Sequence, residues 1–288
     1  MPEPVKKTDP SAPVIGVFDS GVGGLSVLRA IREQLPAQSL IYFADQAHVP
    51  YGPRSLEEVR AFSEEITRFL LEQGARLVVV ACNTASAAAL HSLRSKFPRI
   101  PFVGMEPAVK PAAEGTQTGV VGVLATPATF QGALYASVVE RFANGVVILQ
   151  DTCPGLVQEI EAGRMTGEHT RAILEKALHP MLAQGVDTIV MGCTHYPFVI
   201  PRIEEIIQNY PGNRRVRVID PAPAIARQTG RMLLAHGLNA EEHPGAAVRY
   251  ITSGQPEAFK QLLPGLMGSG GEVEKAFWRG GRLHLAEE

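Results

Sequence analysis

Two cysteines, Cys82 and Cys193, occupy matching places in the chain. Each directly follows an apolar segment typical of a buried β-strand, and each precedes polar residues that can begin a helix. The backbone N–H groups at a helix start favour anions, so we expect them to lower the pKa of such a thiol and to be able to hold a substrate carboxylate. Two acid/base groups facing each other across a cleft are what inversion of a stereocentre requires, because one removes a proton and the other returns one from the opposite face.

The third cysteine, Cys153, has no such counterpart, and we interpret it as a packing residue in the core or near the site. A cysteine considered alone is more often a buried packing residue than a catalytic one, so the hypothesis depends on the matched pair. Three widely spaced cysteines make no disulfide framework, and they show no Cys/His spacing typical of zinc. We therefore expect reduced thiols and no metal.

The composition indicates a folded protein of one large or two medium domains. Of the 288 residues, 45% are hydrophobic and 19% are charged, and 27 basic against 29 acidic side chains give a formal net charge of −2. No overall positive charge is available to hold a polyanion, so we expect no nucleic-acid partner. No apolar run approaches the roughly 18 residues of a membrane span, and we expect no membrane association and a cytoplasmic protein.

The order of apolar and amphipathic segments predicts an α/β fold. Strands are expected at 14–18, 40–43, 77–81, 119–125, 146–149, 187–192, 216–219 and, as the last strand, 249–252. Helices are expected between them, including one that starts at a capping box formed by Ser55 and Glu58 and ends at Gly74. The two halves look like a weak repeat, so we expect two pseudo-symmetric α/β domains with mostly parallel sheets and an active-site cleft between them.

Five motifs in this order resemble one family. They are GVFDSGVGGLSV at 16–27, VPYGP at 49–53, ACNTA at 81–85, VLATPAT at 123–129 and GCTHYP at 192–197. The chain resembles the cofactor-independent glutamate racemases of the aspartate/glutamate racemase superfamily. The resemblance extends over roughly residues 14 to 260 if the weaker segments around Asp220 and Thr252 are included.

The resemblance implies interconversion of L- and D-glutamate without pyridoxal phosphate or metal, with D-glutamate feeding peptidoglycan synthesis, and it implies a homodimer. It makes Cys82 the base toward D-glutamate and Cys193 the base toward L-glutamate. It also implies that Asp19 assists Cys82 and that His195 and Glu161 assist Cys193. The residues that it implies for substrate binding are Asp19, Ser20, Tyr51, Gly52, Asn83, Thr84, Thr126, Thr194 and His195.

The resemblance also implies that the chain returns to the first domain after about residue 220. We expect a first domain of 14–104 plus about 221–265 and a second domain of 105–220, with a flexible leader at 1–13 and a loose, glycine-containing tail at 266–288. Family members often have Thr and Arg where this chain has Gln46 and His48. We therefore assign neither residue to the site and expect His48 in a loop.

Three other functions compete with this interpretation. A Rossmann dinucleotide site is suggested by glycines 21 and 23 after a strand and by Asp45 after the next, although Ser26 stands where Gly or Ala is usual. A Cys–His hydrolase could use Cys193 and His195, although residues two apart need not point toward each other. A non-enzymatic amino-acid-binding protein would suit an interdomain cleft equally well.

Overall fold

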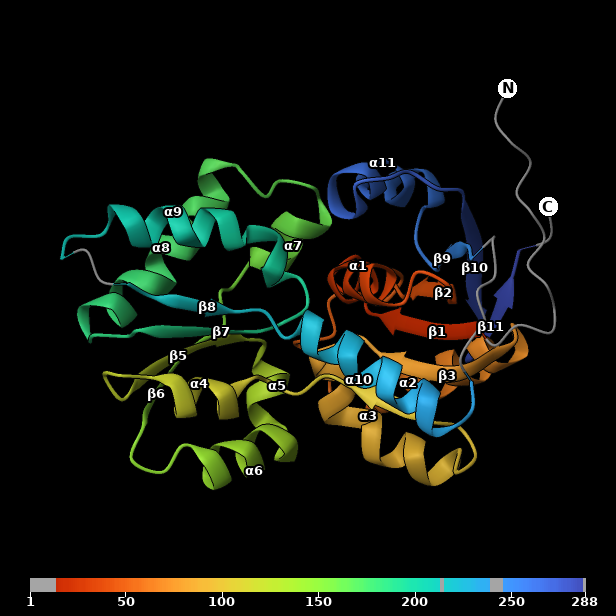
Figure 1. Cartoon of the computed structure of the whole chain (residues 1–288). Coiled ribbons are helices and arrows are strands. Elements are labelled where there is room, and N and C mark those ends of the chain that lie inside the picture. The colour runs from red at the N-terminus through yellow and green to blue at the C-terminus, as the bar shows by residue number, and fades with distance from the viewer. Residues whose placement is uncertain (1–13, 213–214, 239–245, 287–288) are drawn as a thin grey trace.

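The computed structural model describes residues 14–212, 215–238 and 246–286, so the leader expected at 1–13 lies outside the described residues. Every segment expected as a strand forms one, with bounds within two residues of those expected. The strands assemble into two sheets, which lie side by side in Figure 1. The chain therefore has two α/β units, as expected.

The larger sheet has the strand order β11-β10-β9-β2-β1-β3-β4. Its pairs are parallel except for the antiparallel pair of β10 and β11. Its strands are β1 (Val14–Asp19), β2 (Ser39–Ala44), β3 (Ala75–Val80), β4 (Phe102–Gly104), β9 (Val248–Thr252), β10 (Val273–Arg279) and β11 (Arg282–Leu285). Because β1, β2 and β3 are in parallel register, Asp19, Asp45 and Cys82 leave the sheet at the same edge.

The smaller sheet is parallel throughout and has the order β6-β5-β7-β8. Its strands are β5 (Val120–Ala125), β6 (Val147–Asp151), β7 (Thr188–Gly192) and β8 (Arg217–Ile219). The carboxyl ends of β5, β6 and β7 deliver Thr126, Thr152 and Cys193 to one edge. The edges that carry Cys82 and Cys193 are therefore equivalent edges of the two sheets.

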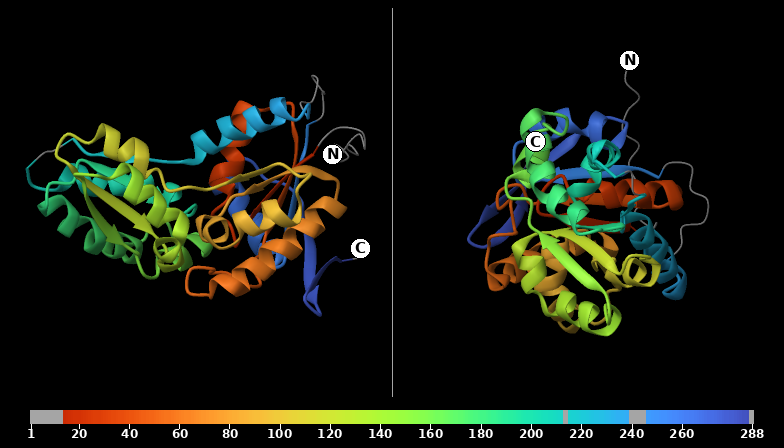
Figure 2. Two further views of the ribbon diagram at one scale, coloured as in Figure 1. Left: turned by 90° about the horizontal axis from the view of Figure 1, so that it is seen from below. Right: turned by 90° about the vertical axis from the view of Figure 1, so that its left-hand side faces the viewer.

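Helices cover both faces of each sheet (Figures 1 and 2). On the larger sheet they are α1 (Leu25–Gln34), α10 (Ala222–Ala235) and α11 (Pro256–Met267) on one face and α2 (Leu56–Glu72) and α3 (Asn83–Lys96) on the other. On the smaller sheet they are α7 (Leu156–Glu161), α8 (Glu168–Ala183) and α9 (Ile200–Asn209) on one face and α4 (Val109–Gly115), α5 (Pro127–Gln131) and α6 (Ala133–Phe142) on the other.

Local sequence signals explain where these helices begin and end. The Ser55 hydroxyl accepts from the Glu58 N–H at 3.2 Å, and the Glu58 carboxylate accepts from the Ser55 N–H at 3.1 Å, which confirms the capping box. Gly74, at a φ of +97°, follows the end of α2 in a conformation that favours glycine. One apolar core contains residues of α1 and α10 from the first unit and of α8 and α9 from the second, and thus joins the two units.

The loose tail expected at 266–288 is wrong for its described part, because 273–279 and 282–285 form β10 and β11. The glycines interpreted as signs of a loose segment are turn residues: Gly268 caps α11, and Gly280 and Gly281 make the hairpin turn at φ values of +57° and +76°. Ala276 and Leu283 are buried against the core of the larger sheet. The strand at 248–252 is therefore not the last, and the expectation also missed the short strand β4.

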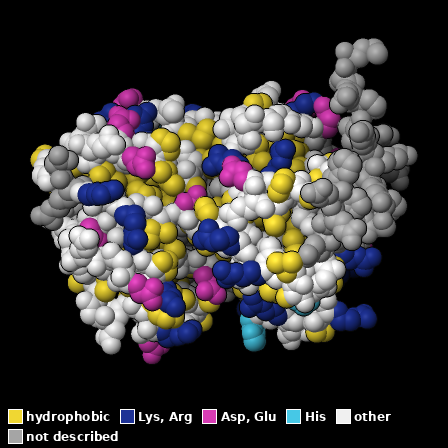
Figure 3. Space-filling model, viewed as in Figure 1, with side chains coloured by type: hydrophobic (Ala, Val, Ile, Leu, Met, Phe, Trp, Pro, Cys, Tyr) yellow, Lys and Arg dark blue, Asp and Glu magenta, His cyan; other side chains and the backbone are white. Residues whose placement is uncertain are grey.

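The surface mixes both signs of charge. On the face seen in Figure 3, Lys and Arg side chains are interspersed with Asp and Glu side chains and with apolar patches. Among the described residues, the structure contains no helix that combines the length and the apolar character needed to cross a bilayer.

Candidate active site

A cavity of about 240 Å³ lies where the carboxyl ends of the two sheets meet, and both Cys82 and Cys193 line it. This volume is below the roughly 300–1,000 Å³ of pockets for drug-sized ligands, which favours a small substrate. Of the residues expected to bind substrate, those that line the cavity are Ser20, Tyr51, Gly52, Asn83, Thr84, Thr126, Thr194 and His195. Asp19 and Glu161 are not among its lining residues, but they contact the lining residues Thr194 and His195.

Cys82 is the N-cap of α3, and its sulfur accepts a hydrogen bond from the Ala85 N–H at 3.5 Å. Asn83 is already the first residue of this helix, so the cysteine itself, and not a polar residue after it, is the cap. The expected lowering of the thiol pKa is wrong for Cys82. Burial and the negative charge of Asp19 outweigh the helix N-terminus and raise the pKa of Cys82 well above its ordinary value.

Asp19 ends β1 and is fully buried. Its Oδ2 accepts from the Gly24 N–H at 2.9 Å, and Thr194 donates to its Oδ1 at 3.4 Å, so the carboxylate contacts the loop after β7. Burial raises the pKa of Asp19, against the opposing effects of the His195 charge, the Gly24 N–H and Cys82. The aspartate expected beside Cys82 is therefore a buried, hydrogen-bonded carboxyl.

Cys193 has a different environment. It follows β7, and the next element is the 3-10 helix η1 (Tyr196–Val199), so no α-helix begins at this thiol. The Cys193 sulfur lies 3.8 Å from His195 Nδ1, and His195 Nε2 lies 2.6 Å from Glu161 Oε1. Burial opposes a charge on the imidazole, but hydrogen bonds to Cys193 and Glu161 raise the pKa of His195 well above its ordinary value.

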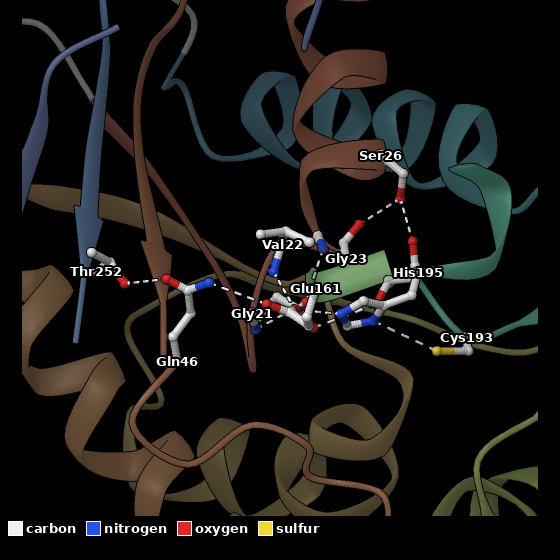
Figure 4. A network of polar contacts seen from close by, with 12 residues as sticks. Gly21, Val22, Gly23, Ser26, Gln46, Glu161, Cys193, His195 and Thr252 are labelled. Atoms are coloured by element: carbon white, nitrogen blue, oxygen red, sulfur yellow. Dashed lines mark hydrogen bonds and ion pairs between the residues drawn. The ribbon is translucent and has the colours of Figure 1, made fainter. Parts of the chain in front are cut away.

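Glu161, the last residue of α7, reaches the glycine loop after β1 (Figure 4). Its Oε1 also accepts from the Val22 N–H at 2.7 Å. Burial disfavours the charged carboxylate, but His195, the Val22 N–H and Gln46 lower the pKa of Glu161. A Cβ at Gly21 would collide with this carboxylate, and one at Gly23 would collide with the His195 ring. The loop thus needs glycine so that groups from the smaller sheet can approach closely.

The binding residues line the cavity with polar groups. The hydroxyls of Thr84 and Thr126 lie 2.8 Å apart, and Thr126 caps α5. Both polar atoms of the Asn83 side chain are buried and have no hydrogen-bond partner among the described residues. Because buried amides are ordinarily paired, Asn83 indicates a polar ligand in the cavity.

The sequence reasoning missed part of the wall. The segment after β6 and the start of α7 also line the cavity, through Thr152, Cys153, Pro154, Gly155, Val157 and Gln158. Cys153 therefore lies at the site, consistent with the interpretation of packing near it, and has a positive φ of 43°. The glycine at 155, which adopts φ +90°, was the available signal that this segment turns sharply after its strand.

Gln46 and Asp45, which the sequence analysis did not assign to the racemase site, do not line the cavity but bond to residues of the site. Gln46 donates to Glu161 Oε2 at 3.1 Å. Asp45 is buried and accepts from the Tyr51 hydroxyl at 2.7 Å and from the Trp278 indole N–H at 2.8 Å. His48 lies in the loop after β2, as expected, 2.8 Å from Asp45. The loop that carries Tyr51 is therefore tied to the C-terminal hairpin.

This geometry bears on two of the alternatives. The glycine loop holds the Glu161 carboxylate, and a dinucleotide pyrophosphate at that loop would meet a like charge. The imidazole of His195 does lie between the Cys193 thiol and the Glu161 carboxylate, which is the arrangement that a thiol hydrolase requires. That reading leaves the second thiol, Cys82 with its own carboxyl Asp19, without a role.

Comparison with known proteins identifies relatives along most of the chain. The Asp/Glu/Hydantoin racemase family model matches residues 15–229. The glutamate racemase of Pseudomonas paraeruginosa is 54% identical over 265 residues, which cover 92% of this chain and 97% of that protein.

Solved structures give the same result. A glutamate racemase isoform from Bacillus anthracis superposes with a TM-score of 0.79 at 32% identity and covers 94% of this chain and 98% of that one. The Escherichia coli glutamate racemase, solved with L-glutamate and the activator UDP-MurNAc-Ala, gives 0.78 at 34% identity and covers 96% and 100%. With a family model over most of its length and relatives of this similarity, the chain belongs to the Asp/Glu/Hydantoin racemase family.

Proposed function

We propose that this protein is a glutamate racemase, which interconverts L- and D-glutamate by proton transfer between two thiols and supplies D-glutamate for peptidoglycan synthesis. The observation that carries the proposal is one small cavity lined by two cysteines, each with its own titratable partner. Membership of the racemase family and the similarity to glutamate racemases support glutamate as the substrate.

The first step from L-glutamate uses Cys193 as the base. A protonated His195 places positive charge beside this sulfur, as a thiolate requires, and Glu161 stabilises the imidazolium. The Cys193 thiolate takes the Cα proton, and the electron pair left at Cα is stabilised by hydrogen bonds to the α-carboxylate. Cys193 then carries the proton as a thiol.

The second step uses Cys82 as the acid. Its raised pKa keeps the proton on sulfur, so the thiol can deliver that proton to the opposite face of Cα. D-glutamate leaves, with Cys82 as the thiolate. From D-glutamate the steps run in reverse, with Cys82 as the base and Cys193 as the acid, and Asp19 assists at Cys82.

The cavity walls bind the charged ends of the substrate. The backbone N–H groups that begin α3 and the Asn83 amide, which has no partner among the described residues, can donate to carboxylates, and the hydroxyl oxygens can accept from the ammonium group. For these contacts we propose Ser20, Tyr51, Gly52, Asn83, Thr84, Thr126, Thr194 and His195. Asp19, which does not line the cavity, contacts the lining residues Thr194 and Cys82.

Circular dichroism of the purified protein with L- or D-glutamate, without added cofactor, tests the function. We expect either enantiomer to lose optical activity, and in heavy water we expect deuterium at Cα of the product. If folded protein leaves both enantiomers unchanged, the proposal is wrong. Mixing with aspartate in place of glutamate is the matched substrate control.

The organisation of the chain is part of the proposal. We propose a first domain of residues 14–104 plus about 221–285 and a second domain of 105–220, since β9, β10 and β11 belong to the larger sheet. From the family resemblance alone we also infer a homodimer in the cytoplasm. Sedimentation at several protein concentrations tests the dimer.

A further inference from the structure

The amide of Gln46 forms a bridge between the two halves of the molecule (Figure 4). Gln46 follows β2 of the larger sheet, and its Nε2 donates to Glu161 Oε2 at the end of α7. On its other side, its Oε1 accepts from the Thr252 hydroxyl at 2.8 Å. The Gln46 side chain therefore joins the segment after β2 and the strand β9 of the larger sheet to α7 of the other unit.

Glu161 fixes which way the amide of Gln46 points. A carboxylate oxygen only accepts, so turning the amide over would set the Gln46 carbonyl oxygen against Glu161 Oε2 as two acceptors. The Thr252 hydroxyl, which accepts from the Gly254 N–H at 2.9 Å, donates to Gln46 Oε1 on the other side. The NH₂ group of Gln46 is therefore held toward Glu161.

The bond from Gln46 fixes the Glu161 carboxylate in turn. Glu161 Oε1 is shared by His195 Nε2 and the Val22 N–H, and among the described residues Gln46 is the donor to Oε2. With both oxygens held, the carboxylate cannot rotate away from the imidazole. A buried carboxylate also needs such donors in order to remain charged.

We propose that Gln46 is a positioning residue of the reaction, which holds the Glu161 carboxylate against His195 and so keeps the imidazolium beside Cys193. The inference rests on the proposed racemisation, in which Cys193 is one of the two bases. Gln46 does not line the cavity, so it acts through Glu161 and not on substrate. The other titratable groups that face this pair are Cys193, Asp19 and Tyr42.

The variant Gln46→Met removes both hydrogen bonds at nearly constant size. We expect kcat to fall about tenfold, which corresponds to one lost bond to a charged group, with KM changed less than about twofold. Without Gln46 the Glu161 carboxylate is held less firmly against His195, so the imidazolium is less stabilised. The deprotonation of His195 and the high-pH limb of activity therefore move to lower pH, by about one unit. Gln150→Met is the matched control, since Gln150 lies on β6 outside the cavity wall and donates to the Tyr135 hydroxyl of α6.

A second variant and a second measurement separate the possible failures. Thr252→Val leaves Gln46 in place but frees its amide, and we expect a smaller change of the same sign. Nuclear magnetic resonance titration of the His195 ring needs no turnover: an unchanged titration in Gln46→Met, with the wild-type fold retained, overturns the inference. If the wild-type protein does not racemise glutamate but this titration shifts, the proposed function fails while the positioning of His195 stands.

Discussion

The two thiols of the cavity come from equivalent sheet edges, but their surroundings differ in charge. Cys82 caps an α-helix and lies beside a single buried carboxyl, whereas Cys193 lies beside an imidazole that is backed by a carboxylate. The Cys82 side favours a protonated sulfur. The Cys193 side supplies positive charge. Two equivalent sheet edges therefore place opposite charges beside their two sulfurs.

This difference shows why neither thiol can be understood from its position alone. A helix N-terminus favours an anion, yet at Cys82 burial and a neighbouring acid outweigh it. At Cys193 the neighbouring positive charge is on His195, and Glu161 of a different element, α7, stabilises that charge. The decisive groups on both sides are those that packing brings to the sulfur.

The largest expected effect is the loss of either thiol. We expect Cys82→Ser and Cys193→Ser each to reduce racemisation in both directions by about 10²–10⁴-fold, because a hydroxyl replaces the acid or base on one face. Polarimetry with each enantiomer measures it, and Cys153→Ala, which keeps the catalytic pair, is expected to stay active. Full activity in either serine variant would remove that thiol from the mechanism.

A smaller effect is expected on the Cys193 side from Glu161→Gln. The change removes the negative charge that holds His195 protonated, so the pKa of His195 falls. His195 then loses its proton at a lower pH than in wild type. The decline of kcat/KM at high pH therefore begins at a lower pH. A pH profile with the same limb as wild type would mean that Glu161 does not support His195.

The smallest of the three effects is expected on the Cys82 side, from Asp19→Asn. Removing the acid's charge lowers the pKa of Cys82 toward its ordinary value, although burial continues to raise it. Ultraviolet absorbance of the thiolate should therefore appear at lower pH than in wild type. In this variant the lost carboxylate had opposed the ionised form of its neighbour, whereas in the Glu161 variant the lost carboxylate had stabilised it. The double variant with Cys82→Ser assigns the absorbance, because the shifted signal must disappear in it.

The sequence predicted the elements and the meeting of the two thiols for a physical reason. Parallel strands send their carboxyl ends to one edge, so residues placed directly after apolar strands, such as Cys82 and Thr126, must line a common site. Local signals, such as the capping box at Ser55, were equally readable. Both kinds of information are encoded within a few neighbouring residues.

The rest depended on contacts between distant parts of the chain. Gln46 meets a carboxylate 115 positions away and a hydroxyl 206 positions away, and no local pattern marks either partner. The place of Glu161 beside His195 followed only from the family resemblance. The C-terminal hairpin was misread because glycine is common both in loose segments and in tight turns, and only the burial of Ala276 and Leu283 distinguishes them.

The bond between Trp278 and Asp45 gives the protein a built-in optical reporter. Trp278 is the chain's single tryptophan, so its intrinsic emission comes from one indole. The N–H of that indole is bonded to the same carboxylate that holds the Tyr51 hydroxyl at the cavity wall. Movement of this wall when a ligand enters can thus be followed by fluorescence, without any attached dye.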